Sequence, residues 1–223
     1  MKRQLEDTEN SKSSITTQIM DSSSHPSSPI APKEQNSKRE RDKGNLIFGF
    51  TTFLLSESMV FVSFFIAYII MRSTTARWLP AGVSGAELST AIIVNTIVLL
   101  SSSLVIYLAE RALKKQNLWL FRLLWLATSV MGAYFLAGTF KEWQGLDFGL
   151  DTGLVGATFY LFTGFHALHI IVGIFLQMLM LIRSFIPGNY NRGHSGVTVV
   201  SLFWHFVDGI WVVLFSLLYL WRA

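Results

Sequence analysis

The segment from Val197 to Trp221 constrains the fold of this chain more than any other. It is about 25 residues of nearly unbroken apolar and aromatic side chains, which as an α-helix can cross a bilayer core of about 30 Å. The whole chain has a mean hydropathy of +0.44, and only 14% of its residues are charged. The sequence therefore predicts an all-α protein that crosses a membrane several times.

Four further apolar stretches precede this segment, and each is long enough to cross a membrane. We predict a bundle of membrane-spanning helices at about residues 46–71, 88–109, 118–140, 152–182 and 197–221. Residues 1–45 are rich in Ser, Lys and Glu, with too few apolar side chains to offset the entropy of ordering. The predicted organisation is a disordered polar tail, residues 1–45, followed by one five-helix domain, residues 46–223.

The basic residues are distributed unevenly over the predicted connections. Fourteen of the 18 Lys and Arg residues fall in the tail and around the second and fourth connections, and four fall on the opposite side. Because cytoplasmic segments are enriched in Lys and Arg, we predict the N-terminus inside and the C-terminus outside. The net charge of +4 comes mostly from these segments and indicates no nucleic-acid partner. The absence of cysteine excludes disulfides and thiolate metal sites.

Ionisable side chains also occur inside the predicted spans, at Glu57, His166, His169, His205 and Asp208. Buried ionisable groups in membranes almost always face protein or water and have a partner, so we expect one polar seam through the bundle. His205 and Asp208 are three residues apart and share a helix face, which is compatible with a simple pair or with a proton or ligand site. Glu57 is compatible with proton handling, with lipid headgroup binding, or with a hydrogen bond between helices.

The histidine pattern argues against a redox centre in this chain. His166 and His169 lie on the same side of one helix, so they cannot be opposite axial ligands of one haem. A metal would need further ligands such as His205 and Glu57, and the Glu-x-x-His pattern of carboxylate-bundle sites is absent. We therefore expect no metal here, and we expect the histidines to form hydrogen bonds between closely packed helices.

Four segments in order along the chain resemble cytochrome c oxidase subunit III: SESMVFVSFFIAY (56–68), NTIVLLSSS (95–103), TFYLFTGFHALHIIVG (158–173) and WHFVDGIW (204–211). The resemblance covers about residues 46–221. The chain is similar to the five-helix bacterial and cyanobacterial form of the family. It implies a helix bundle packed against subunit I of a haem–copper terminal oxidase. That complex takes electrons from cytochrome c, reduces O2 to water and moves protons across the membrane.

The resemblance also implies which subunit of the complex has which function. Haem and copper are expected in partner subunits I and II and not in this chain. The implied work of this chain is to stabilise subunit I, to bind membrane lipids and to support proton uptake. On this basis Glu57 is assigned a proton-uptake or lipid role, and His166, His169, His205 and Asp208 are assigned structural or lipid contacts. The expected location is a bacterial cell membrane or a cyanobacterial thylakoid membrane.

The sequence departs from the family pattern at two places. The longer family form has two more helices before the first span, and Thr198 stands where the family often has Glu.

The nearest alternative function is that of subunit III of a quinol oxidase or of a nitric-oxide-reductase-type complex. A small membrane transporter is a more distant one, because it would require inverted repeats and broken helices that the sequence does not show.

Overall fold

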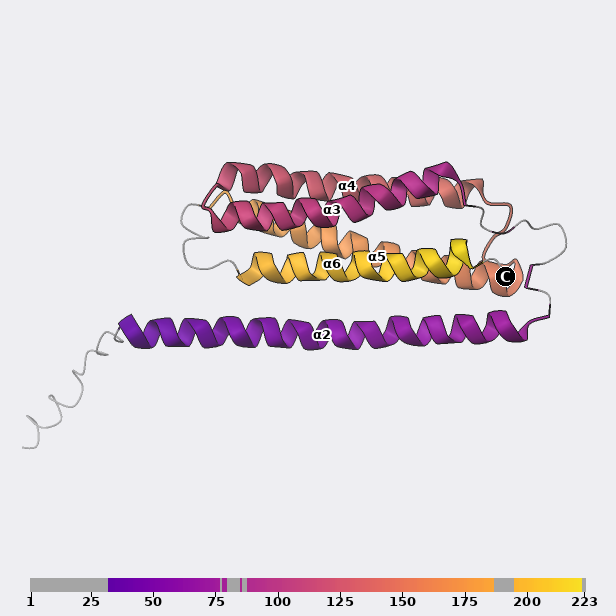
Figure 1. Ribbon diagram of the computed structural model, residues 1–223, viewed down its shortest axis with the longest axis horizontal. Coiled ribbons are helices and arrows are strands. Elements are labelled where there is room, and N and C mark those ends of the chain that lie inside the picture. Colours follow the sequence, from indigo (N-terminus) through magenta and orange to yellow (C-terminus); the bar gives the residue numbers. More distant parts are fainter. Residues whose placement is uncertain (1–31, 77, 80–84, 86–87, 187–194, 222–223) are drawn as a thin grey trace, which may run out of the picture. The chain divides into compact units, whose positions relative to one another are not determined.

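A computed structural model of the chain describes residues 32–76, 78–79, 85, 88–186 and 195–221. Its helices are α2 (Pro32–Thr74), α3 (Thr90–Lys114), α4 (Leu118–Gly145), α5 (Gly153–Arg183) and α6 (Ser195–Phe215), which the π-helical turn η2 (Ser216–Leu220) extends (Figure 1). Five segments are long and apolar enough to cross a membrane: Gly44–Thr74, Thr90–Lys114, Leu118–Gly145, Gly153–Arg183 and Ser195–Leu220. The predicted all-helical bundle with five long apolar helices is therefore confirmed.

The helix ends differ from the sequence-based boundaries in two places. α3 continues to Lys114 and α4 to Gly145, past the predicted ends at residues 109 and 140. Both extensions contain charged residues, which end an apolar run but are good helix formers and can extend toward the membrane surface. The predicted tail lies mostly outside the described residues, and its part from Pro32 onward is helical as the start of α2.

Helices α3 to α6 form the bundle that holds the core. Each packs against the next in the chain, and α6 returns against α3, so that the four helices close on one another. Figure 1 shows them running side by side along the long axis of the domain. The first span of the chain, in α2, contacts α5 and α6 through aromatic rings: Phe61 lies 5.2 Å from Phe165 and 6.3 Å from Phe206 between ring centroids.

Trp204 of α6 is the side chain around which this bundle is packed. It is fully buried, and its Nε1 donates a hydrogen bond of 2.8 Å to Ser102 Oγ of α3. The edge of its ring meets α4 at Gly132, where a Cβ would stand 2.6 Å from Cη2. Its other side meets α5 at Gly173, where a Cβ would stand 2.9 Å from Cε3. One indole thus contacts three helices, and two of them approach it only because they carry glycine.

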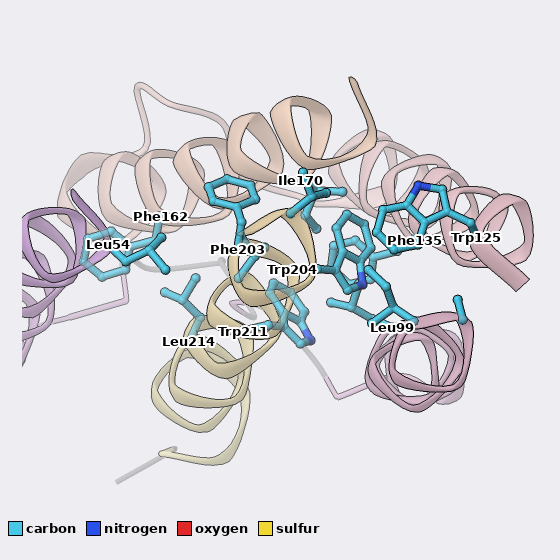
Figure 2. Close-up of a cluster of buried hydrophobic side chains, with 14 of the residues drawn as sticks. Leu54, Leu99, Trp125, Phe135, Phe162, Ile170, Phe203, Trp204, Trp211 and Leu214 are labelled. Atoms are coloured by element: carbon cyan, nitrogen blue, oxygen red, sulfur yellow. The ribbon is translucent and has the colours of Figure 1, made fainter. Parts of the chain in front are cut away.

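Trp211 repeats this arrangement two turns further along α6. Its Nε1 donates a hydrogen bond of 3.1 Å to Thr96 Oγ1 of α3, and its ring meets Phe135 of α4 edge-on at 4.7 Å. Figure 2 shows Trp204 and Trp211 on the same side of α6, with Phe135 and Leu99 beside them. The spacing of seven residues places both indoles on one helix face, and both N–H groups find a partner on α3.

We expect Gly132→Ala to destabilise the bundle, because the new methyl group would overlap the Trp204 ring. Such overpacking costs about 1–3 kcal/mol, which exceeds the gain of up to about 1 kcal/mol in helix propensity. Gly209→Ala on α6 is the matched control, since nothing lies within 4 Å of its Cβ position. Thermal unfolding in mild detergent should give a lower midpoint for Gly132→Ala and an unchanged or higher one for Gly209→Ala. Equal midpoints would contradict the packing role of Trp204.

Candidate functional site

Glu57 of α2 and His169 of α5 form the first polar contact between spans. Glu57 Oε2 lies 3.4 Å from His169 Nε2, with side chains 25% and 10% exposed. The other ring nitrogen, His169 Nδ1, lies 2.8 Å from the carbonyl oxygen of Phe165 one turn earlier in the helix. The sequence placed both residues in the spans, and the structure shows that they face each other.

The hydrogen bonds of His169 determine what this pair can do chemically. A carbonyl oxygen can only accept, so Nδ1 carries a hydrogen and donates it to Phe165. Nε2 then either accepts a hydrogen bond from a neutral Glu57 or donates one to an ionised Glu57. A hydrogen bond between Glu57 Oε2 and His169 Nε2 therefore needs one proton between a carboxyl group and an imidazole, either of which can hold it.

His205 and Asp208 of α6 form the second polar contact through a serine of α3. Ser103 Oγ donates a hydrogen bond to Asp208 Oδ2, and His205 Nδ1 lies 3.0 Å from the same hydroxyl. Because the hydroxyl hydrogen is directed at Asp208, His205 Nδ1–H is the donor to Ser103 Oγ. The two side chains point across to α3 and meet there, so the direct pairing of His205 with Asp208 is replaced by a bridge through Ser103.

His166 differs from the other histidines. It is 1% exposed, and neither ring nitrogen has a hydrogen-bond partner among the described residues. Its ring stacks on Trp211 at 5.0 Å and meets Phe135 edge-on at 5.9 Å. His166 and His169 are offset around α5, so one faces the bundle core and the other faces α2. The single seam expected from the sequence is therefore divided into separate contacts.

The structure adds polar contacts that the sequence analysis did not assign. The acid of α3, Glu110, accepts a 3.0 Å hydrogen bond from Thr198 of α6 and lies 3.4 Å from Lys114. Near the other end of the bundle, Tyr219 donates a 2.6 Å hydrogen bond to Glu142 of α4. Thr198 thus contributes a hydroxyl that donates to an acid on the facing helix. In the sequence, the serines at 101–103 and the isolated acids Glu110 and Glu142 were the features that could have indicated these contacts.

These groups connect helices and do not converge on one point. In the ranges that the structure describes, no three His, Cys, Asp or Glu side chains lie close enough together to hold a metal ion. A buried polar group in a membrane interior is costly unless it is satisfied, so each of these contacts fixes how two helices meet. The arrangement can hold protons locally and pin helix positions.

We expect Ser103→Ala to destabilise the bundle, because it removes the hydroxyl that joins His205 to Asp208 and leaves a buried carboxyl without its partner. Leaving such a group unsatisfied costs about 1–3 kcal/mol. Ser101→Ala is the control, since Ser101 is exposed and bonds only to the Ile97 carbonyl oxygen of its own helix. Thermal unfolding in detergent should show a lower midpoint for Ser103→Ala alone. An equal shift of the unfolding midpoint in both variants, or no shift in either, would mean that the Ser103 bridge does not stabilise the bundle.

Comparisons with known proteins agree with this architecture. The family described as cytochrome c oxidase subunit III matches residues 35–223. Cytochrome c oxidase subunit 3 of Thermostichus vulcanus is 42% identical over 175 residues, which cover 78% of this chain and 86% of that protein. The protein of the same name from Synechocystis sp. is 42% identical over 78% of this chain and 75% of its own length. That of Papio hamadryas is 33% identical over 80% and 70%.

These matches confirm the resemblance found in the sequence motifs and favour it over the quinol-oxidase, nitric-oxide-reductase and transporter alternatives. The family match covers residues 35–223, which include every polar contact between spans described above. The chain belongs to the cytochrome c oxidase subunit III family: it is a multi-pass membrane subunit of the respiratory oxidase complex and carries no catalytic centre itself.

Proposed function

We propose that this chain packs against subunit I of the oxidase, in a complex that also contains subunit II, and stabilises the catalytic subunit. The observation that carries the proposal is that side-chain hydrogen bonds in its spans join its own helices. Ser102, Ser103 and Thr198 each bond a side chain of a facing helix. Haem and copper then belong to the partner subunits, and this chain supplies a rigid surface beside them.

The outer surface of the bundle suits this role. Large apolar side chains are exposed on every span, for example Leu104 at 62%, Val130 at 59% and Phe175 at 61%. In a membrane such a surface contacts lipid tails or the spans of another subunit. A stable bundle with an apolar exterior can therefore pack against subunit I while membrane lipids fill the remaining surface.

In this proposal the ionisable residues have mainly structural roles. Glu57 and His169 fasten α2 to α5, His205 and Asp208 fasten α6 to α3, and His166 packs against Trp211. Glu57 is the member of this set with a second role open to it, because its side chain keeps 25% exposure while its Oε2 lies 3.4 Å from His169 Nε2. A proton-uptake role for Glu57 is thus separable from its structural role by experiment.

The complex itself provides the test. An affinity-tagged chain purified in mild detergent is expected to carry subunits I and II, with a haem spectrum and copper. Glu57→Gln keeps a hydrogen-bonding side chain opposite His169, and we expect normal assembly and normal turnover from it. Glu57→Leu leaves His169 Nε2 without a partner, and we expect reduced recovery of subunit I.

Glu142→Gln is the matched control, because it changes a half-buried acid that faces Tyr219 and not His169. Normal assembly with slow turnover in Glu57→Gln alone would assign Glu57 to proton uptake. A tagged chain that purifies folded but without oxidase subunits or haem would contradict the proposed function.

We also propose that the N-terminus lies inside and that the host membrane is a bacterial cell membrane or a thylakoid membrane. The excess of Lys and Arg on one side supports the orientation.

α4 runs from Leu118 to Gly145, so Lys115 and Leu150 flank its two ends. Because the chain has no cysteine, Lys115→Cys and Leu150→Cys introduce single labelling sites. In intact cells or right-side-out vesicles an impermeant maleimide should label Leu150→Cys alone, and labelling of Lys115→Cys alone would reverse the orientation.

A further inference from the structure

We propose that the groove between the end of α3 and the start of α4 binds one anionic phospholipid, with its headgroup on Arg111 and Lys115 and an acyl chain in the groove. The inference depends only on the membrane location of the chain and not on its docking to subunit I. It rests on the shape of the groove, on the charge at its mouth and on the rigid turn that holds the two helices apart.

The groove has the composition that an amphiphile requires. It encloses about 440 Å³ and is lined by Leu108, Arg111, Ala112, Lys115, Leu120 and Leu124. Apart from the two basic residues, every lining side chain is aliphatic. Leu108 of α3 and Lys115, which directly follows α3, are seven positions apart, which at 1.5 Å per residue spans about 10 Å along the helix axis. A basic end joined to an aliphatic stretch of this length matches a headgroup joined to a hydrocarbon chain.

The charge at the mouth is positive and is not neutralised by the neighbouring acid. Arg111 and Lys115 are one turn apart on the same face of α3, and neither forms an ion pair with the described residues. The nearby acid, Glu110, is already engaged by Lys114 at 3.4 Å and by Thr198 at 3.0 Å. The guanidinium of Arg111 lies over the Tyr107 ring at 5.4 Å, which holds it in place and leaves its N–H groups for an anion.

The turn between the helices keeps the groove open in a fixed shape. Lys115 N–H donates to the Arg111 carbonyl oxygen at 3.1 Å, and Gln116 takes a left-handed conformation with φ 60° that reverses the chain. Asn117 then donates its N–H to the Ala112 carbonyl oxygen at 3.0 Å, and its Oδ1 accepts from Leu120 N–H at 3.1 Å. A site that is already formed loses little entropy when a ligand binds.

The position of the groove identifies the occupant as a lipid. Arg111 and Lys114 lie in the last turn of one span, and Leu118 begins the next, so the basic mouth lies at the headgroup level of the bilayer. Basic pockets between the ends of membrane helices are suited to anionic headgroups, because each Lys or Arg near the surface attracts their negative charge. The aliphatic floor then reaches into the depth that acyl chains occupy.

Native mass spectrometry of the intact oxidase complex in mild detergent, titrated with phosphatidylglycerol, tests the proposal. We expect the Arg111→Gln, Lys115→Gln double variant to bind one fewer phosphatidylglycerol, with an apparent affinity at that site at least about tenfold lower. Lys115→Gln should weaken binding by itself. Lys141→Gln is the matched control, since it removes the same charge from an exposed position near the far end of α4, outside the groove, and should leave binding unchanged.

A second variant separates a lipid from a simple anion. Leu108→Trp fills the aliphatic part of the groove and keeps both basic residues, so we expect it to abolish the same binding event. Retention of phosphatidylglycerol by Leu108→Trp would overturn the proposal in favour of anion binding without a chain. Equal loss of phosphatidylglycerol binding in Lys141→Gln and Lys115→Gln would show unspecific charge attraction and would overturn the proposed site. A photoreactive residue at Leu120 that crosslinks to another subunit and not to lipid would also overturn it.

Discussion

The contact of one indole ring with three helices is the constraint on which the rest of this structure depends. Trp204 is buried between Ser102 of α3, Gly132 of α4 and Gly173 of α5. The hydrophobic effect contributes little to the association of helices within a membrane, because lipid tails are as apolar as the side chains. Close packing and hydrogen bonds must therefore decide which helices meet and in which register. The Trp204 ring supplies both at one point.

The polar contacts around this centre explain how a chain with acids and histidines in its spans can be a structural subunit. Ser103 joins Asp208 Oδ2 and His205 Nδ1 to α3, and Thr198 of α6 donates a hydrogen bond to Glu110 of α3. Each contact lies between two helices of the same chain, so removing one would loosen a specific pair. This is the behaviour expected of a subunit that stabilises a redox partner. It also accounts for ionisable residues within the spans of a chain without a catalytic centre.

The sequence predicted those features that depend on local pattern and length. The five spans follow from hydropathy, and the choice of polar residues follows from their rarity within those spans. What it could not predict are contacts between residues far apart in the chain. The partner of Asp208 is a serine 105 positions earlier, and a single hydroxyl carries no signal that distinguishes it from its neighbours Ser101 and Ser102. The packing of Gly132 against Trp204 is likewise visible only once α4 and α6 are placed together.

The histidines show the same limit within a single helix. A separation of three residues placed His166 and His169 on one side of α5, but two neighbouring helices share that side. His169 therefore meets Glu57 of α2, and His166 meets Trp211 of α6. The helical periodicity of the sequence identifies which residues point away from lipid. The arrangement of the other helices determines which residues each of them contacts.

Selective removal of this chain from the purified oxidase tests the central claim most directly. Haem and copper per subunit I would be measured before and after removal, together with the thermal stability of the remaining complex. The account predicts an unchanged haem spectrum and copper content, with a lower unfolding temperature. Loss of haem or copper in proportion to the chain removed, with unchanged stability of the remainder, would contradict it.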